Sequence, residues 1–199
     1  MAMMFNPDGT LTRNAAYSVG ELYYGKSNKL TTRSLIRNTL SFKANFLENR
    51  LNVNGDFTYQ NTKREIVNKL VPVPFSERPG EIVTEGRSSL LADNRNINYT
   101  AANLYADYSA TFGLHELKVM GGWNLEIYTL RDQQSQQDEL LLEDLTDFNL
   151  AVGENMRITG GGSEWATSGF FSRINYNYAN KYLVELNGRY DGSSKFPST

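Results

Sequence analysis

The sequence predicts an all-β fold of antiparallel strands, and three observations lead to this prediction. Apolar and polar residues alternate in six segments, as in strands that have one apolar face. Aromatic residues make up 12% of the chain, which argues against intrinsic disorder. Short and long connections alternate between the segments. Two architectures fit this pattern, a section of a transmembrane β-barrel and a soluble or surface-attached β-sandwich that binds a partner, and the barrel is favoured for the reasons below.

Composition excludes several classes of function. The 199 residues include 20 basic and 22 acidic side chains, a balance that argues against a nucleic-acid-binding protein. There is no Cys, and His115 is the only His, so a catalytic triad, a thiolate zinc site and a two-histidine metal site are not expected. No apolar run approaches the roughly 20 residues of a transmembrane helix. We therefore predict neither an enzyme nor a cofactor or metal site.

The first predicted strand pair covers residues 36–46 and 51–60. Phe42 and Phe46 share an apolar face in the first of these segments, and Lys43 lies on the opposite face. The second segment continues the alternation, and residues 47–50 are short enough for a tight hairpin.

The second predicted pair covers residues 102–112 and 117–127. Leu104, Val119 and Trp123 belong to its apolar face, opposite polar residues such as Lys118. Residues 113–116 form the connection, which again predicts a hairpin.

The third predicted pair covers residues 168–178 and 182–191, joined by residues 179–181. Its alternation is less regular, with Ile174 and Leu186 on the apolar face and Arg173 on the other.

Charge and aromatic placement favour a membrane-embedded sheet. No position on the six apolar faces carries Asp, Glu, Lys or Arg, although charged residues make up 21% of the chain. Aromatic residues of these faces gather near the segment ends, whereas Gly55, Ala106, Gly121 and Gly188 fall at mid-segment. Two aromatic bands around a band of smaller apolar residues are typical of membrane interfaces. The side chains predicted to face lipid include Phe42, Leu104, Val119, Trp123 and Leu186.

The connections predict an orientation in the membrane. Residues 65–97 and 130–167 form loops too long for a compact soluble domain, whereas transmembrane β-barrels have short periplasmic turns and long extracellular loops. Because six strands cannot close a barrel, we expect residues 1–199 to be a section of a larger one, without its plug domain and remaining strands.

Three stretches resemble SusC/RagA-type TonB-dependent outer-membrane transporters. The most specific is NYNYANKYLVELNGRYDGSSKFP at residues 175–197, where Lys195 stands in place of the Arg of many relatives. The stretches SLIRNTLSFKANFLENRLNVNGDFTYQNT at 34–62 and FGLHELKVMGGWNLE at 112–126 support it. The resemblance covers nearly the whole chain but only a middle portion of the family's barrel.

The resemblance implies a function in transport. Members of this family import bulky nutrients such as oligosaccharides or peptides across the outer membrane of Gram-negative-type bacteria. They work with a SusD-like surface lipoprotein as a lid and with the TonB complex as the energy source. For this chain the resemblance implies a lipid-facing wall, a polar lumen lining and extracellular loops.

Four residues are candidates for substrate contact. Trp165 is predicted to lie in an exposed loop, where its ring is able to stack on a sugar ring. Arg173, Arg189 and Asp191 lie on the predicted polar face. Carboxylates such as Asp191 also suggest a glycosidase pair, but their positions on strand faces favour lumen hydration or ion pairing.

The second long loop has three further features. Residues 131–148 are acidic, and a solvated charge run is favoured over a Ca²⁺ site because the spacing fits no known calcium loop. For four leucines of this loop we expect local packing within the loop rather than contact with a lid: Leu140, Leu141, Leu142 and Leu145. Gly160, Gly161 and Gly162 predict a hinge or a disordered loop.

Overall fold

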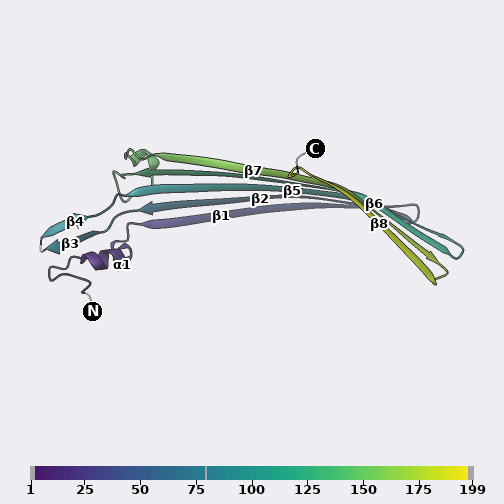
Figure 1. The fold of residues 1–199 in the computed structure, drawn as a ribbon, viewed down its shortest axis with the longest axis horizontal. Coiled ribbons are helices and arrows are strands. Elements are labelled where there is room, and N and C mark those ends of the chain that lie inside the picture. Colours follow the sequence, from purple (N-terminus) through teal and green to yellow (C-terminus); the bar gives the residue numbers. More distant parts are fainter. Residues whose placement is uncertain (1–2, 79, 197–199) are drawn as a thin grey trace. The chain divides into compact units, whose positions relative to one another are not determined.

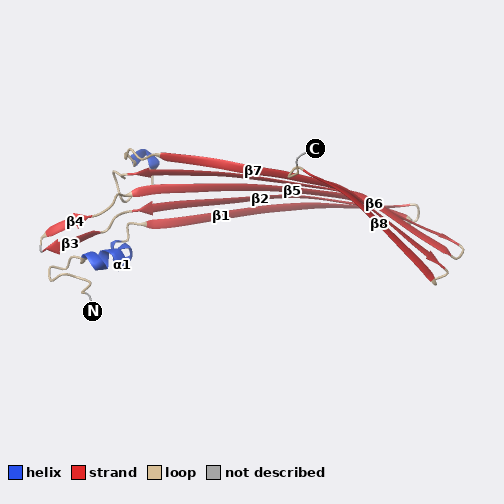
Figure 2. Ribbon diagram, in the orientation of Figure 1, coloured by secondary structure: helices blue, strands red, loops and turns tan. Residues whose placement is uncertain are grey.

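The chain is nearly all β, as its computed structural model shows for residues 3–78 and 80–196. Strands are the dominant element (Figures 1 and 2) and hold 69% of the residues. In chain order the elements are α1 (Arg13–Tyr24), β1 (Asn28–Phe46), β2 (Leu51–Leu70), β3 (Pro74–Arg78), β4 (Glu81–Thr84), β5 (Ser89–Phe112), β6 (His115–Asp138), the 3-10 helix η1 (Phe148–Leu150), β7 (Arg157–Tyr178) and β8 (Tyr182–Ser193). Among the described residues, no helix is both long and apolar enough to cross a membrane.

The six long strands form one antiparallel sheet with the order β1-β2-β5-β6-β7-β8, and β3 and β4 form a separate hairpin. All six predicted strands are therefore confirmed, and each of the three predicted pairs is a pair of sheet neighbours. Within the described residues the sheet is open, with β1 and β8 at its edges, and the barrel is not closed.

The tight turns owe their shape to left-handed backbone conformations. Ala179 and Asn180 have φ of 53° and 55°, and the Lys181 N–H donates to the Tyr178 carbonyl at 2.9 Å, which is the pattern of a type I′ hairpin turn. The middle turn is shorter than predicted, because β6 begins at His115.

The two long connections are shorter than predicted. Strand β2 continues to Leu70 and β5 begins at Ser89, while β6 continues to Asp138 and β7 begins at Arg157. The prediction ended these strands where the apolar residues end. Backbone pairing continues there, supported by cross-strand polar contacts such as Arg64 Nη2 to Asp93 Oδ2 at 2.9 Å.

Gly160, Gly161 and Gly162 lie inside β7, so the predicted hinge or disordered loop is wrong. A Cβ atom at Gly162 would lie 2.8 Å from the carbonyl oxygen of Leu130, which is closer than real side chains come. The glycine run therefore permits a close backbone approach to β6, a recognised use of glycine in strands.

The chain divides into two compact units. Unit 1 comprises residues 1–33, 64–95 and 132–161, and it contains α1, the β3–β4 hairpin and the connection 139–156. Unit 2 comprises residues 34–63, 96–131 and 162–199, and it contains the three tight turns and all of β8. The stretch 175–197 that carries the resemblance belongs to unit 2, and its last residue, Pro197, lies outside the described residues.

The helix α1 was not predicted, although its ends carry ordinary signals. The Thr12 hydroxyl accepts from the Ala15 N–H at 3.3 Å, and Gly25 ends the helix with φ of 67°. Helix α1 packs against β3, and a Cβ atom at Gly20 would lie 2.8 Å from Val73 Cγ1. The helix is only 12 residues long, and a search for the period-two alternation of strands does not detect a short helix.

Candidate functional site: the polar wall of unit 2 and the loop cluster of unit 1

The pairing of β7 with β8 separates apolar from polar side chains. Directly opposed residues of antiparallel strands lie on the same face of a sheet. Ile174 lies opposite Leu186, whereas Arg173 lies opposite Asn187. The alternation predicted for the least regular pair is therefore confirmed. We call the two surfaces of unit 2 the apolar wall and the polar wall.

Close contacts extend both walls across the sheet. A Cβ atom at Gly55 would contact Leu104 at 3.5 Å and Phe42 at 3.9 Å, which places these three residues of β1, β2 and β5 on the apolar wall. A Cβ atom at Gly122 would instead meet Phe171 and Tyr105, which belong to the polar wall.

Hydrogen bonds and ion pairs connect neighbouring strands on the polar wall. The carboxylate of Asp107 accepts from Asn52 at 3.2 Å and lies 3.5 Å from the ammonium of Lys118. Further cross-strand bonds join Arg37 to Gln60, Thr39 to Thr58, Asn103 to Asp56, Asn177 to Glu116 and Arg173 to Asn187. Such a network suits a wetted surface, because the charged side chains that it includes have polar partners on the neighbouring strands.

Two hollows lie on unit 2, with volumes of about 590 and 330 Å³. Most of their lining side chains belong to the polar wall, including Lys118, Asn175 and Glu185 in the larger hollow and Arg173 and Arg189 in the smaller one. Both hollows are therefore lined mainly, though not entirely, by side chains of the polar wall.

The predicted substrate residues Arg173, Arg189 and Asp191 all lie on the polar wall of the β7–β8 pair. Arg189 Nε lies 2.7 Å from Asp191 Oδ2, and Arg173 Nε donates to Asn187 Oδ1 at 2.8 Å. A Cβ atom at Gly169, opposite Asp191, would lie only 2.0 Å from Asp191 Oδ1. Gly169 therefore leaves room for the carboxylate to lie across β7 toward Asn124.

Trp165 is not a loop residue, contrary to the sequence prediction, because β7 begins eight residues earlier than Trp165, at Arg157. Its ring stacks on Tyr128 with centroids 5.5 Å apart, and the ammonium of Lys195 lies 4.7 Å from its centroid. The half-buried ring is thus engaged by two neighbours within unit 2. The sequence offered no sign of this, since the partners lie 37 and 30 residues away.

The residues predicted to face lipid lie on the apolar wall. Phe42, Leu104 and Leu186 have exposed fractions of 56%, 51% and 61%. Val119 and Trp123 share this wall by their alternation along β6, and Trp123 Nε1 donates to Ser168 Oγ at 2.8 Å. Contact with lipid remains a prediction for all five.

In unit 1, a polar cluster joins α1 to the β3–β4 hairpin. Arg13 Nη2 donates to Glu85 Oε1 at 2.8 Å, Arg13 Nη1 lies 3.2 Å from Glu77 Oε1, and the Tyr17 hydroxyl donates to the Glu85 carboxylate. The Tyr17 hydroxyl, and then the Arg13 guanidinium, lower the pKa of Glu85 below its ordinary value. Beneath these groups Phe75 is almost fully buried.

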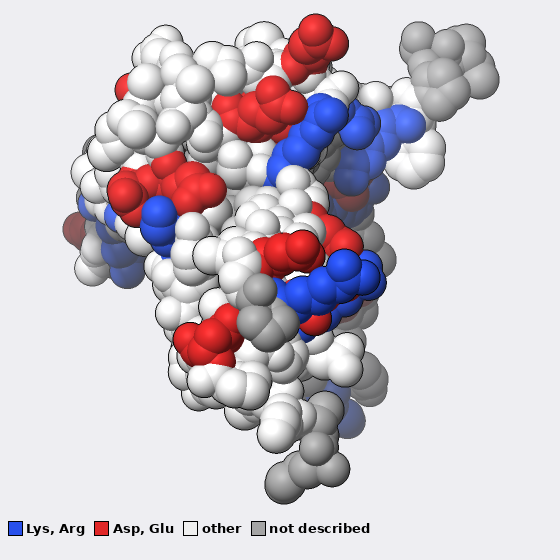
Figure 3. All heavy atoms as spheres, turned by 90° about the vertical axis from the view of Figure 1, so that its left-hand side faces the viewer, with Lys and Arg blue, Asp and Glu red and all other residues white. Residues whose placement is uncertain are grey.

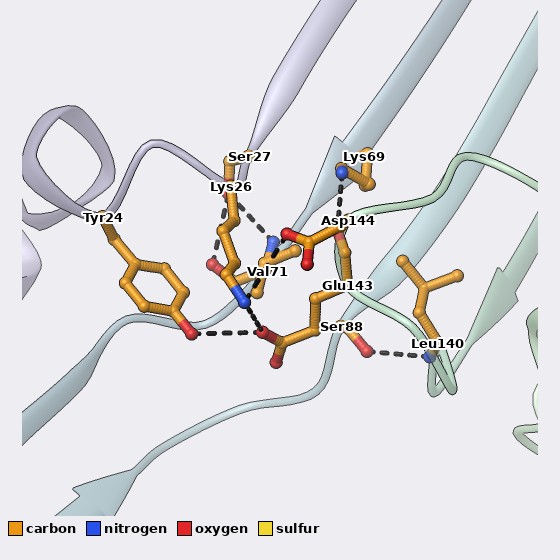
Figure 4. Close-up of polar contacts among 9 residues, drawn as sticks. All are labelled: Tyr24, Lys26, Ser27, Lys69, Val71, Ser88, Leu140, Glu143 and Asp144. Carbon is orange, nitrogen blue, oxygen red and sulfur yellow. Dashed lines mark hydrogen bonds and ion pairs between the residues drawn. The ribbon is translucent and has the colours of Figure 1, made fainter.

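The connection 139–156 is fixed at its base. Leu140 and Ala151 pair through an isolated β-bridge and form a small core with Leu90. The Leu140 N–H donates to Ser88 Oγ at 2.8 Å (Figure 4). The local packing predicted for Leu140 is thus confirmed, whereas Leu141, Leu142 and Leu145 remain exposed.

A second polar cluster, which sequence reasoning missed, holds the tip of this connection (Figure 4). The Glu143 carboxylate accepts from the Tyr24 hydroxyl and from Lys26 Nζ, each at 3.1 Å. The Glu143 carbonyl accepts from Lys69 Nζ at 2.6 Å, and Lys69 is only 4% exposed. The bond to Glu143 is the main cause that raises the pKa of Lys26.

The acidic residues of 131–148 do not converge. Within residues 3–78 and 80–196, no group of three or more His, Cys, Asp or Glu side chains is arranged to hold a metal ion. Figure 3 shows acidic and basic side chains next to one another on the face in view, in agreement with the ion pairs of unit 1.

Comparison with known proteins tests the family resemblance. The chain is 26% identical over 202 residues to TonB-dependent receptor P3 of Formosa agariphila, an alignment that covers 97% of this chain and 19% of that receptor. TonB-dependent receptor P39 of the same organism is 27% identical over 142 residues, with 70% of this chain and 13% of that receptor covered. The resemblance to TonB-dependent receptors is confirmed. No family model matches the chain.

Solved structures agree with this likeness at the level of the fold. The RagAB peptide transporter matches 99% of this chain and 21% of its own chain, with a TM-score of 0.76 and 15% identity. The RagAB peptide importer in its closed-closed state matches 89% of this chain and 19% of its own, with a TM-score of 0.77 and 16% identity. The chain thus spans about a fifth of the length of P3 and of these RagAB chains.

Proposed function

We propose that this chain is a section of the wall of a TonB-dependent outer-membrane transporter that imports bulky nutrients, either oligosaccharides or peptides. The apolar wall of unit 2 contacts lipid, and the polar wall lines the lumen. The section performs no catalysis. The observation that carries the proposal is the segregation of the two walls, since the β7–β8 register places every charged residue of its paired positions on the polar wall.

In this proposal the loops of unit 1 are the part of the section that contacts the nutrient. With the tight turns in the periplasm, the β3–β4 hairpin and the connection 139–156 are extracellular, where they meet the nutrient and a SusD-like lipoprotein lid. The TonB complex acts through the parts of the transporter outside this section. The description of the solved relatives as a peptide transporter and importer supports a peptide as the cargo.

The alternative function is that of a β-sandwich that binds a partner through its loops. A sandwich needs a second sheet against the apolar wall. Among the described residues, the six-stranded sheet is accompanied only by the two-stranded β3–β4 sheet, which belongs to unit 1. This favours the transporter.

Arginine substitutions in the complete transporter that contains this section test the proposal. We expect Leu104→Arg and Val119→Arg to impair membrane insertion, because an arginine near the bilayer midplane costs about 2–4 kcal/mol. The matched variants Asp107→Ala and Lys118→Ala, on the polar wall, should insert normally. The heat-dependent gel mobility of the folded barrel reports insertion. Equal tolerance of both pairs would contradict the assignment of the walls.

A further inference from the structure

The Glu143 carboxylate in unit 1 is bound as a ligand's carboxylate would be. One of its oxygens, Oε2, accepts from a neutral hydroxyl, that of Tyr24, and from an ammonium, that of Lys26 (Figure 4). Lys26 Nζ also lies 5.3 Å from the centroid of the Tyr24 ring, which helps to hold the ammonium beside the hydroxyl. Two donors that converge on one carboxylate oxygen form a charge-assisted binding site.

The donors and the occupant come from different parts of unit 1. Tyr24 ends α1 and Lys26 follows it in the linker to β1, and this linker is attached to the end of β2 by Ser27, whose Oγ accepts from the Val71 N–H at 2.9 Å. Glu143 lies instead in the tip of the connection, residues 141–147, as does Asp144, whose Oδ1 lies 3.6 Å from Lys26 Nζ. The donors are therefore held independently of their occupant.

The tip is held mainly by polar contacts of Glu143, which include the bond from the buried Lys69 to its carbonyl, whereas the base is held by buried apolar residues. Leu141, Leu142 and Leu145 are 50% exposed or more, so lifting the tip uncovers little apolar surface. The side chains of Lys26 and Glu143 are 33% and 36% exposed, and ion pairs of this exposure contribute little net stability. The base remains in place through Leu140 and Ala151, which are buried.

We propose that Tyr24 and Lys26 form a binding site for the carboxylate of a ligand, and that Glu143 occupies this site until the ligand displaces it. The inference rests on the proposed function, in which nutrients reach these loops from outside the cell. Displacement of the tip also takes the Glu143 carbonyl away from the buried Lys69, so the ligand must supply an acceptor to this second ammonium as well. A peptide carboxyl terminus and a uronate sugar both present the required group.

Binding of small acids to the complete transporter, purified in detergent, tests this site. The probes for calorimetry are N-acetyl-trialanine with a free carboxyl terminus against its amide, and D-glucuronate against D-glucose. We expect the wild-type protein to prefer the acid in at least one of these two comparisons. The comparison that shows the preference identifies the source of the carboxylate.

Three variants separate the site from its occupant. Lys26→Met should abolish the preference for the acid, and Tyr24→Phe should weaken acid binding about threefold through the loss of one hydrogen bond. Glu143→Gln should strengthen acid binding about fivefold, because it weakens an internal competitor. Glu154→Gln is the matched control, since Glu154 is an exposed acid of the same connection, and it should change nothing.

The outcomes separate the inference from the proposed function. The site would be overturned if the wild-type protein and the Glu143→Gln variant both bound the acid and the neutral probe equally. It would also be overturned if Glu143→Gln and Glu154→Gln strengthened acid binding to the same extent. Nutrient uptake by cells that carry the wild-type transporter is measured in parallel. If uptake is normal and the acid preference is absent, the site is wrong and the proposed function stands. If uptake is absent and the acid preference is present, the carboxylate site is supported and the proposed function is wrong.

Discussion

The two units bury apolar side chains to very different extents. Among the described residues, the buried apolar residues of unit 1 are Ala15, Ala16, Val71, Phe75, Leu90, Leu140 and Ala151, whereas Ala110 is the only one in unit 2. Yet unit 2 carries large apolar side chains at high exposure, such as Tyr190 at 79%. Unit 1 therefore has small buried cores, whereas the described residues of unit 2 form an exposed apolar surface and no comparable core.

This difference indicates what each unit needs in order to be stable. Burial of apolar surface is the dominant favourable contribution to folding, so unit 1 stabilises its helix and hairpin internally. Unit 2 obtains little such contribution from its described residues, and its apolar wall needs an apolar environment. Lipid supplies that environment in the proposed function, and each of the following predictions tests this contrast.

The largest expected effect is on solubility. In buffer without detergent, we expect the isolated chain to aggregate, because the apolar wall is uncovered and β1 and β8 are open edges. Size-exclusion chromatography after refolding measures the outcome. A monodisperse monomer that melts cooperatively in plain buffer would remove the contrast between the units and favour the β-sandwich.

The second expected effect is a difference in accessibility between the two ends of the strands. Asn49 lies in the tight turn between β1 and β2, and Asp144, whose side chain is 81% exposed, lies in the tip of 139–156. A cysteine introduced at Asp144 of the complete transporter should react with a membrane-impermeant maleimide in whole cells, whereas one at Asn49 should not. The reverse labelling pattern would place unit 1 on the periplasmic side and remove its role in nutrient contact.

A third, smaller effect compares two phenylalanines. Phe75 of unit 1 is 2% exposed, so Phe75→Ala should leave a cavity and lower the local stability of the β3–β4 hairpin by about 3 kcal/mol. Hydrogen exchange of its amides should then accelerate by about a hundredfold. Phe170→Ala is the matched control in unit 2, where the side chain is 62% exposed and leaves no cavity. Similar effects of the two variants would contradict the contrast in burial.

The sequence predicted unit 2 well and unit 1 poorly, for a physical reason. A one-layer sheet with two different surroundings imposes a period of two on its residues, so the faces of Ile174 and Leu186 follow from alternation alone. The strand ends in unit 1 carry no such period. There, backbone pairing continues through polar residues such as Arg64 and Asp93, whose side chains bond at 2.9 Å across the strands.

The loop clusters were beyond prediction for a related reason. Lys26 and Glu143 lie 117 residues apart, and nothing in the local sequence of either indicates the other. Their contact depends on where the sheet brings the α1–β1 linker and the connection 139–156. The same holds for Trp165, whose position in the sequence resembled a loop because β7 begins with polar and glycine residues.

The smallest expected effect is a pH dependence confined to unit 1. The pKa of Glu85 is lowered in the folded chain, by the Tyr17 hydroxyl and then by Arg13, so its ionised form stabilises the contact of α1 with the hairpin. This contribution is present above the unfolded pKa of a glutamate, about 4.3, and is lost as the pH falls through the lower folded value. Brief pepsin digestion between pH 4.5 and about 2.5 should therefore cut α1 progressively faster, relative to the tight turns of unit 2 in the same sample.

Glu85→Gln should remove most of this change, whereas Glu81→Gln, at an exposed position of β4, should retain it. The effect is small because the acid and its partners are exposed to solvent. Equal acceleration in both units would mean that acid loosens the sheet as a whole, and the Glu85 contact would then have no separate role.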